Sequence, residues 1–527
     1  MHRLFPILTV ALFLIFLCTP PLITLLTPDQ EISKTEKRKL ASLPNLGSTS
    51  DQLVEFPAKF EEYYNDHFGL RNLLVFYQQL FSYRTFQVSS SPLVTVGEDN
   101  WLFFNGERAM DAYLGLTPIS QGHLELYRWA LIDRRNWLAE NGISYIFVPV
   151  PNKESVYPEH LPRRIRKNAG ISFYDQVIGY LNTPPGFPEY IDVKETLLHQ
   201  KIDNRLFLKT DSHWNVAGAF AAYTDIGTMV KALNIPMRLL QEEDIDWEAV
   251  SFSGDLATLL HLHDILTETA PEIKGIPSCT KSLASVKDSK PLGTPPFRTF
   301  SNDPRKFTRV QECTENKTSA LVIYDSFGEF LRPFLNASFG TVYYSNRDFN
   351  QIKDFVEAVQ PDVIIDQRVE RNLSNAMLSD LGIENETVSR HFPQAEHTLL
   401  QIDSGSNAEE FGVSAGAVVQ LVKDGLQIRS ATQFPALGLR YDSGESGGAV
   451  MVRVRLSSKQ DTQCLLYYTT KDNPEFIPMH TRTFEVKKGY NEFYFRLPGT
   501  GGERKLQFHP GTIAGEYLLH SFVIKKQ

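Results

Sequence analysis

The sequence is poor in cysteine and has no concentrated positive charge. Its 527 residues include only four cysteines, Cys18, Cys279, Cys313 and Cys464. They are too few and too scattered for a disulfide scaffold, and no two of them form a Cys-x-x-Cys metal pair. A single Cys279–Cys313 bridge stays open for an oxidising compartment. The net charge is −9 and no long basic tract occurs, which argues against a nucleic-acid partner.

Internal repeats of solenoid or propeller length are also lacking, which argues against those architectures. The composition, with 42% hydrophobic and 12% aromatic residues, is typical of a globular protein. The chain is longer than a single hydrophobic core usually supports, so two or more domains are expected.

An apolar segment opens the chain. Residues 4–26 are mostly apolar, follow Arg3 and are interrupted by Pro6, Pro20 and Pro21. The segment is long enough to cross a bilayer, and its inner part has the length of a signal-peptide core. No convincing small-x-small cleavage site follows, so an uncleaved anchor is favoured over a cleaved signal. Residues 1–28 are assigned to this segment and residues 29–50 to a charged linker, and the rest is expected to be exported.

The middle of the chain alternates between helix and strand patterns. A helix is expected over residues 51–86, a hairpin over 94–104, and a helix from residue 121 that ends near Asn141-Gly142. Further helices are expected over 194–201 and behind residue 215. Strands are expected at residues 143–150, 184–193, 320–324, 340–345 and 361–366. This alternation predicts an α/β, doubly wound, mostly parallel sheet in a domain of residues 51–395, with an insertion at about 237–309.

The residue pattern changes after about residue 400, from alternating helices and strands to strands alone. Short alternating strands separated by Gly, Asp, Asn and Pro turns are expected at residues 449–456, 463–469, 481–486, 492–497, 505–509 and 516–524. They predict a C-terminal antiparallel β-sandwich over residues 400–527.

Two short stretches carry the candidate chemistry. Residues 209–215, KTDSHWN, place Asp211 two residues before His213, where the carboxylate can hold one ring nitrogen and leave the other free as a base. Ser326 follows the strand 320–324, where a strand-to-helix turn pushes a hydroxyl outward. We predict that Asp211, His213 and Ser326 form one acyl-transfer site.

Each part of this site also has a simpler interpretation. The serine is a common helix N-cap, the Asp-x-His pair a cap beside a surface histidine, and Trp214 a core residue. A metal site at Asp211 and His213 is the rival chemistry, with a third ligand from residues 261–264, HLHD. We predict neither a metal nor a cofactor.

Several motifs resemble one known family. TDSHWN and YDSFG are accompanied by FEEYYNDHFGLRNLL at 60–74, VPVPNKESVYPEHLP at 148–162, SGDLATLL at 253–260 and VERNL at 369–373. Together they resemble the SGNH-hydrolase-like domain of the alginate O-acetyltransferase family, the AlgJ/AlgX type, over residues 50–385. The family's catalytic Asp, His and Ser fall on Asp211, His213 and Ser326. Tyr324 stands where the family commonly has glycine, which leaves the geometry of the serine turn open.

The resemblance implies an O-acetyltransferase of bacterial cell-envelope or exported polysaccharide that works through an acyl-enzyme. It also implies a periplasmic location at the inner membrane and a membrane-bound O-acyltransferase that supplies acetyl groups. Lys153, Tyr157, Trp214 and Arg371 are candidates for contacts with the sugar or the oxyanion. Two alternatives stay open, a carbohydrate O-acetyl esterase with the same triad and a non-catalytic glycan-binding or assembly protein. The sandwich contains the aromatic residues Tyr467, Tyr468, Tyr490, Phe493, Tyr494 and Phe495.

Overall fold

The computed structural model describes residues 4–33, 38–46, 50–184, 186–277, 309–312, 316–346, 352–373, 380–406, 412–442, 444, 448–471, 473–477, 480–499 and 502–527. The suggested Cys279–Cys313 bridge lies outside the described residues.

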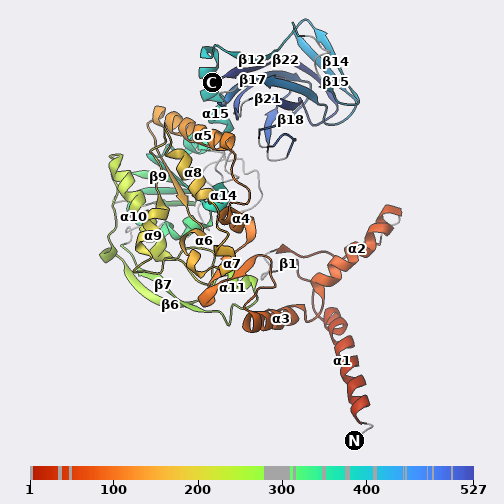
Figure 1. The fold of residues 1–527 in the computed structure, drawn as a ribbon, viewed down its shortest axis with the longest axis vertical. Helices are drawn as coiled ribbons and strands as arrows, with labels where there is room; N and C mark the ends of the chain where they lie inside the picture. The colour runs from red at the N-terminus through yellow and green to blue at the C-terminus, as the bar shows by residue number, and fades with distance from the viewer. Residues whose placement is uncertain are drawn as a thin grey trace.

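The chain begins with a projecting apolar helix, α1 (Leu4–Leu26), followed by the two-residue strands β1 (Ile32–Ser33) and β2 (Arg38–Lys39). Figure 1 shows α1 extending away from the rest of the protein. Its window Ile7–Thr24 has a mean hydropathy of 2.3 and no buried residues, so this helix is long and apolar enough to cross a membrane.

The single helix expected over residues 51–86 is wrong, because the structure has two, α2 (Ser50–His67) and α3 (Arg71–Phe86). The chain breaks at Leu70, which has a left-handed φ of 68°. Gly69 lies against α1, where a Cβ atom would stand 2.1 Å from the carbonyl oxygen of Pro20. This close approach explains why the periodic pattern on both sides of residue 69 does not form one helix.

A five-stranded sheet lies at the centre of the α/β domain, in the order β5-β11-β9-β10-β8. The strands β5 (Ser144–Val150), β11 (Val363–Val369), β9 (Ser319–Tyr324) and β10 (Thr341–Asn346) run parallel, and β8 (Arg309–Glu312) pairs antiparallel at the edge. The predicted mostly parallel sheet is confirmed. The described part of residues 184–193 does not form the expected strand, and Tyr190 there makes an isolated bridge with Phe147.

Helices cover both faces of this sheet (Figure 1). Along β9, Val322 packs into the core on one face, and Leu321 and Ile323 into the core on the other. Core residues of the first face come from α9 (Val193–Gln200), α10 (Val216–Ala232) and α12 (Arg332–Ser338). Those of the second come from α5 (Gln121–Glu140), α8 (Phe173–Leu181), α13 (Ile352–Val359) and α15 (Leu381–His391). Buried strands between two helical layers are typical of α/β proteins.

Short elements surround the carboxyl edge of the sheet. The expected hairpin forms from β3 (Val94–Val96) and β4 (Leu102–Phe104). The segment assigned to an insertion contains a second hairpin, β6 (Asp246–Phe252) and β7 (Glu268–Gly275), with α11 (Asp255–Leu259) between its strands. The remaining short helices are α4 (Ala109–Leu114), α6 (Lys153–Val156), α7 (Arg163–Arg166) and α14 (Glu370–Leu373).

The C-terminal part is an antiparallel β-sandwich, as predicted. One sheet has the order β14-β15-β22-β17-β20, with β12 also paired to β22, and the other has the order β13-β16-β21-β18-β19. All six expected strands are present, as β17 (Val450–Ser458), β18 (Thr462–Tyr468), β19 (Thr481–Val486), β20 (Gly489–Leu497), β21 (Glu503–His509) and β22 (Gly515–Lys526). Five further strands were not predicted, β12 (Thr398–Ile402), β13 (Gly412–Val413), β14 (Ala417–Val422), β15 (Gly425–Ser430) and β16 (Leu437–Asp442). The domain boundaries stay a prediction.

Candidate active site

The loop that carries Asp211 and His213 is held around a buried ammonium group. Lys153, at the start of α6, donates hydrogen bonds from Nζ to the carbonyl oxygens of Leu208 (3.0 Å), Lys209 (3.3 Å) and Asp211 (2.5 Å). The residue is 2% exposed, and burial lowers the pKa of Lys153 to about 8. Three carbonyls directed at one ammonium fix the backbone path that leads into the dyad.

The hairpin between β6 and β7 supports the same loop from another side. A carboxylate of β7, Glu268, accepts hydrogen bonds from Lys209 N (2.9 Å), Thr210 N (2.8 Å) and Thr210 Oγ1 (2.7 Å). Gly254 packs so tightly on the loop that a Cβ atom would lie 2.4 Å from the Cβ of Asp211. The segment that the sequence marked as an insertion therefore forms part of the site.

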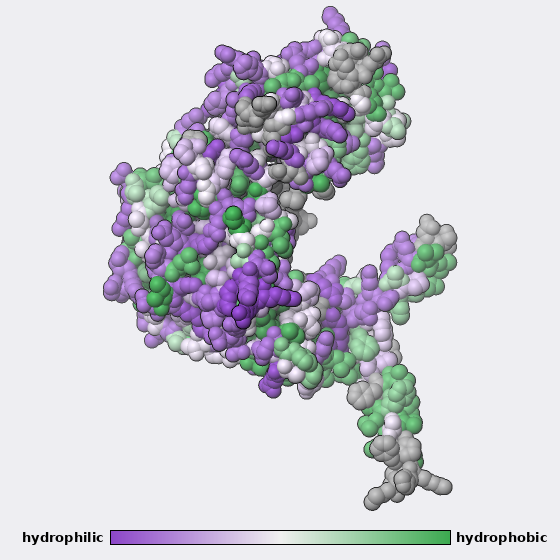
Figure 2. Space-filling view, viewed as in Figure 1, coloured by the Kyte–Doolittle hydropathy of each residue, from purple (hydrophilic) through white to green (hydrophobic). Residues whose placement is uncertain are grey.

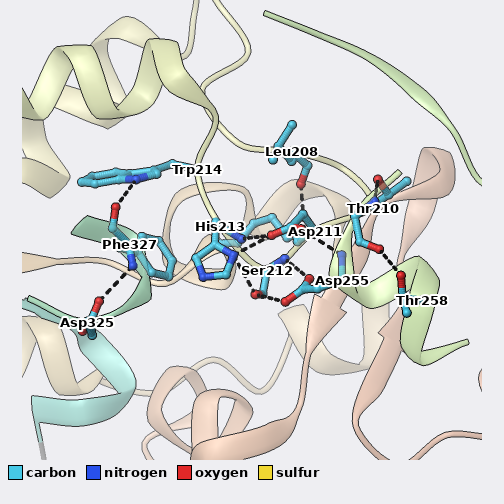
Figure 3. A network of polar contacts seen from close by, with 12 residues as sticks. Leu208, Thr210, Asp211, Ser212, His213, Trp214, Asp255, Thr258, Asp325 and Phe327 are labelled. Carbon is cyan, nitrogen blue, oxygen red and sulfur yellow. Dashed lines mark hydrogen bonds and ion pairs between the residues drawn. The ribbon is translucent and has the colours of Figure 1, made fainter. Parts of the chain in front are cut away.

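Asp211 and His213 form a hydrogen-bonded dyad. His213 Nδ1 lies 2.6 Å from Asp211 Oδ1, which also accepts the backbone N–H of His213 at 3.0 Å, and Asp211 Oδ2 accepts Asp255 N at 2.8 Å (Figure 3). Burial by itself would raise the pKa of Asp211, but the imidazole and the two backbone donors outweigh it and hold the pKa at about 2. A carboxylate on Nδ1 leaves Nε2 as the reactive nitrogen. Within the described residues, His213 Nε2 is buried and has no hydrogen-bond partner.

Asp255 is a site residue that sequence reasoning did not single out, although its motif SGDLATLL was noticed. Its carboxylate accepts Ser212 N and Ser212 Oγ, both at 2.8 Å. Ligand atoms of Asp211, His213 and Asp255 lie within 4.8 Å of one another, a spacing that could hold a metal ion. The oxygens of both carboxylates already accept N–H or O–H groups, so their arrangement fits an oriented dyad better than a metal site. Residues 261–264 do not belong to this group.

Ser326 lies where the sequence predicted, directly after β9, and is half-buried. Asp325 before it is fully buried and accepts Phe327 N (3.1 Å), Gln367 Nε2 (3.1 Å) and Val369 N (2.7 Å). These bonds tie the turn to β11. Asp325 and Gln367 were not recognised as supports, because their contact joins two strands distant in sequence.

The tyrosine that replaces the family's common glycine is accommodated within the turn. Tyr324 donates its hydroxyl to Glu329 at 2.9 Å. Its side chain fills the space beside Gly328, where a Cβ atom would lie 2.5 Å from Tyr324 Cβ. A small residue at 328 thus makes room for the large one at 324.

The two candidate segments lie side by side. Trp214 Nε1 donates to the carbonyl oxygen of Phe327 at 3.0 Å, across 113 residues of sequence (Figure 3). The His213 ring centroid is 4.9 Å from that of Phe327 and 5.8 Å from that of Phe330. The imidazole therefore packs on the turn that begins with Ser326.

The four residues predicted to contact substrate have almost no accessible surface. Exposure is 2% for Lys153, 5% for Tyr157, 0% for Trp214 and 4% for Arg371. Tyr157 Oη accepts Leu206 N at 3.0 Å, and Arg371 donates to Glu107 (2.8 Å) and Asn152 (3.2 Å). These bonds support the surrounding loops, and a role in substrate binding stays a prediction.

Comparisons with known proteins show which family this chain resembles. Residues 94–293 match the family model of the SGNH hydrolase-like domain of acetyltransferase AlgX. The probable alginate O-acetylase AlgJ of Pseudomonas aeruginosa is 23% identical over 262 residues, which cover 46% of this chain and 61% of AlgJ. The AlgJ of Pseudomonas fluorescens is 26% identical over 243 residues, 44% of this chain and 57% of that protein. The resemblance to the AlgJ/AlgX family is confirmed. The chain spans about six tenths of the length of these relatives.

Solved structures are similar as well. The O-acetyltransferase domain of Pseudomonas putida AlgJ aligns with 53% of this chain and 92% of its own, with 20% identity and a TM-score of 0.33. Pseudomonas aeruginosa AlgX aligns with 82% of this chain and 94% of its own, with 13% identity and a TM-score of 0.35. The match to the AlgX model includes Asp211, His213 and Asp255 and ends before Ser326.

Proposed function

We propose that this protein is an O-acetyltransferase that acts on a bacterial cell-envelope or exported polysaccharide, with Ser326 as nucleophile, His213 as base and Asp211 as its orienting carboxylate. The observation that carries the proposal is the unpartnered Nε2 of His213, on a ring fixed by Asp211 and packed against the serine turn. The relatives named as alginate O-acetylases supply the substrate class.

The chemistry takes two steps. His213 Nε2 removes the Ser326 hydroxyl proton as Oγ attacks the acetyl carbonyl of a donor, and the donor's leaving group departs with that proton. A sugar hydroxyl then gives its proton to His213 and attacks the acetyl-serine. The O-acetylated sugar leaves, and Ser326 recovers its proton. Because Asp211 stays ionised, it stabilises the imidazolium formed in each step.

The oxyanion needs hydrogen-bond donors at the turn. The N–H groups of Phe327 and Gly328 are bound to the side chain and the carbonyl of Asp325. This leaves the N–H of Ser326 as the backbone donor of the turn that we assign to the oxyanion.

A direct experiment separates transfer from hydrolysis and from binding. The purified full chain is incubated with p-nitrophenyl acetate, with and without a soluble polysaccharide, beside Ser326→Ala and, as matched control, Ser457→Ala in the sandwich. We expect acetyl groups on the glycan with the unmodified chain and the control, and none with Ser326→Ala. Acetate release at the same rate with and without the glycan would favour the esterase. Absence of both products and of an acetyl-enzyme would favour the glycan-binding alternative.

We also propose that α1 anchors the protein in the inner membrane, with the catalytic domain in the periplasm. The exposed apolar window of α1 supports an anchor. A membrane-bound O-acyltransferase would supply the acetyl groups, as the resemblance implies. In fractionated cells, the full chain should stay with membranes after alkaline extraction, and recovery in the soluble fraction would contradict the anchor.

A further inference from the structure

Helix α3 has an apolar face that nothing in the described structure covers. Its inner side packs on the core beneath the hairpin of β3 and β4 through Phe76, Leu80 and Tyr83. Its outer face, defined here as Leu73, Leu74, Tyr77 and Phe81, is 47%, 48%, 58% and 62% exposed. The spacing of these four residues places them on one side of the helix. The two faces adjoin on the helix surface, and the exposed outer face needs a second apolar environment.

The position of α3 indicates what that environment is. Two residues before α3 begins, Gly69 donates its N–H to Thr24 Oγ1 at 2.8 Å, and Thr24 is the last residue of the apolar window of α1. The start of α3 therefore lies at the level where α1 would leave a bilayer. Figure 1 shows α3 lying across the base of the α/β domain beside the end of α1, and Figure 2 shows hydrophobic residues over α1 and at this base.

The charges of α3 fit a lipid surface. The helix has no acidic residue and carries Arg71 and Arg84, within a chain whose net charge is −9. The preceding helix α2 contains several acidic residues, so the lack of acids is local to α3. Aromatic side chains such as Tyr77 and Phe81, flanked by arginine, are typical of helices that lie in the interface of an anionic bilayer.

We propose that the outer face of α3 inserts into the surface of the membrane that α1 spans. The catalytic domain then contacts the bilayer at two points, the span and this helix, and is held in one orientation instead of hanging from a single anchor. The proposal rests on α1 lying in the bilayer and not on the acyl-transfer chemistry, so each can fail without the other.

A tryptophan reporter on the full chain tests this. Tyr77→Trp places the reporter on the outer face, and Tyr490→Trp is the matched control, because both tyrosines are 58% exposed and Tyr490 lies in the sandwich. Each variant is reconstituted in vesicles of phosphatidylcholine and phosphatidylglycerol, with or without brominated acyl chains. The added emission is measured against the parent protein.

Bromine should quench the added emission of Tyr77→Trp and leave that of Tyr490→Trp unchanged. Because the vesicles hold no other protein, quenching identifies lipid as the occupant. Equal emission of Tyr77→Trp in both kinds of vesicle would overturn the proposal. Quenching should be weaker in vesicles of phosphatidylcholine alone, because Arg71 and Arg84 then lack anionic lipid to contact. Equal quenching with and without phosphatidylglycerol would overturn the role given to these two arginines.

Discussion

Replacing Gly254 by alanine tests whether the β6–β7 segment positions the dyad. A Cβ atom at residue 254 would lie 2.4 Å from Asp211 Cβ and 2.6 Å from Asp211 Cα and N. The backbone of Gly254, with φ −93° and ψ −174°, is open to alanine, so contact with Asp211 is the obstacle. The added methyl group therefore acts on Asp211 itself.

The size of the effect follows from these distances. Ordinary contact begins at 3.4 Å, so Asp211 or Gly254 must move by about 1 Å. Forcing a methyl group into a packed site costs about 1–3 kcal/mol of unfolding free energy. A 1 Å displacement of a catalytic group lowers the rate by about 10²-fold. We expect Gly254→Ala to fold with reduced stability and to lose about two orders of magnitude in kcat/KM.

The assay is p-nitrophenyl acetate turnover beside urea unfolding. Gly179→Ala is the matched control, because it lies in α8, is exposed, and its new Cβ would meet nothing within 4 Å. In a helix this change should be neutral or should stabilise by up to about 1 kcal/mol, with unchanged turnover. Full activity in Gly254→Ala would refute the view that this contact holds the dyad in place.

Asp211→Asn should lower turnover by about 10³–10⁴-fold in acetyl-ester assays, because the amide no longer holds the imidazole in its reactive tautomer. The pKa of Asp211 is about 2, below its unfolded value, so its stabilising contribution is present above about pH 4 and is lost as the pH falls toward 2. In urea unfolding across that pH range, the free energy of unfolding should fall more steeply for the parent protein than for Asp211→Asn. Parallel curves would contradict the lowered pKa of Asp211. Trp214→Phe leaves the buried carbonyl of Phe327 without its donor and should lower the free energy of unfolding by about 1–3 kcal/mol. Trp247→Phe should lower the free energy of unfolding by less, since the indole N–H of Trp247 has no partner among the described residues. Equal losses in the two variants would show that the hydrogen bond of Trp214 does not stabilise the fold. Arg496→Met removes the ion-pair partner of buried Asp133, between the α/β domain and the sandwich, and should lower the free energy of unfolding by about 3–5 kcal/mol. Adding Asp133→Leu should restore most of that loss, and a double variant no more stable than Arg496→Met would contradict the pairing.

Local patterns in the sequence predicted much of the architecture. The buried runs of β5, β9 and β11 and the helical spacing of α5 and α10 depend on neighbours along the chain, so periodicity reveals them. The six strands of the sandwich that were expected combine alternation with turn residues at their ends. The placement of Asp211 and His213 before a helix was also a local signal.

Features set by distant contacts were not predictable. Leu70 ends a helical pattern because Gly69 meets α1, which no local window contains. Glu268 and Asp255 reach the loop from a segment whose composition suggested only an insertion. The edge strand β14 has no clear alternation of apolar and polar residues, because all six of its residues are at least partly exposed.

The central claim is that His213 activates Ser326, and labelling with a serine-directed fluorophosphonate tests it most directly. Peptide mass spectrometry of the labelled full chain should find the adduct on Ser326, with the labelling rate falling by orders of magnitude in His213→Ala. A chain that stays unlabelled at Ser326, or that labels equally fast without the imidazole, would contradict the account.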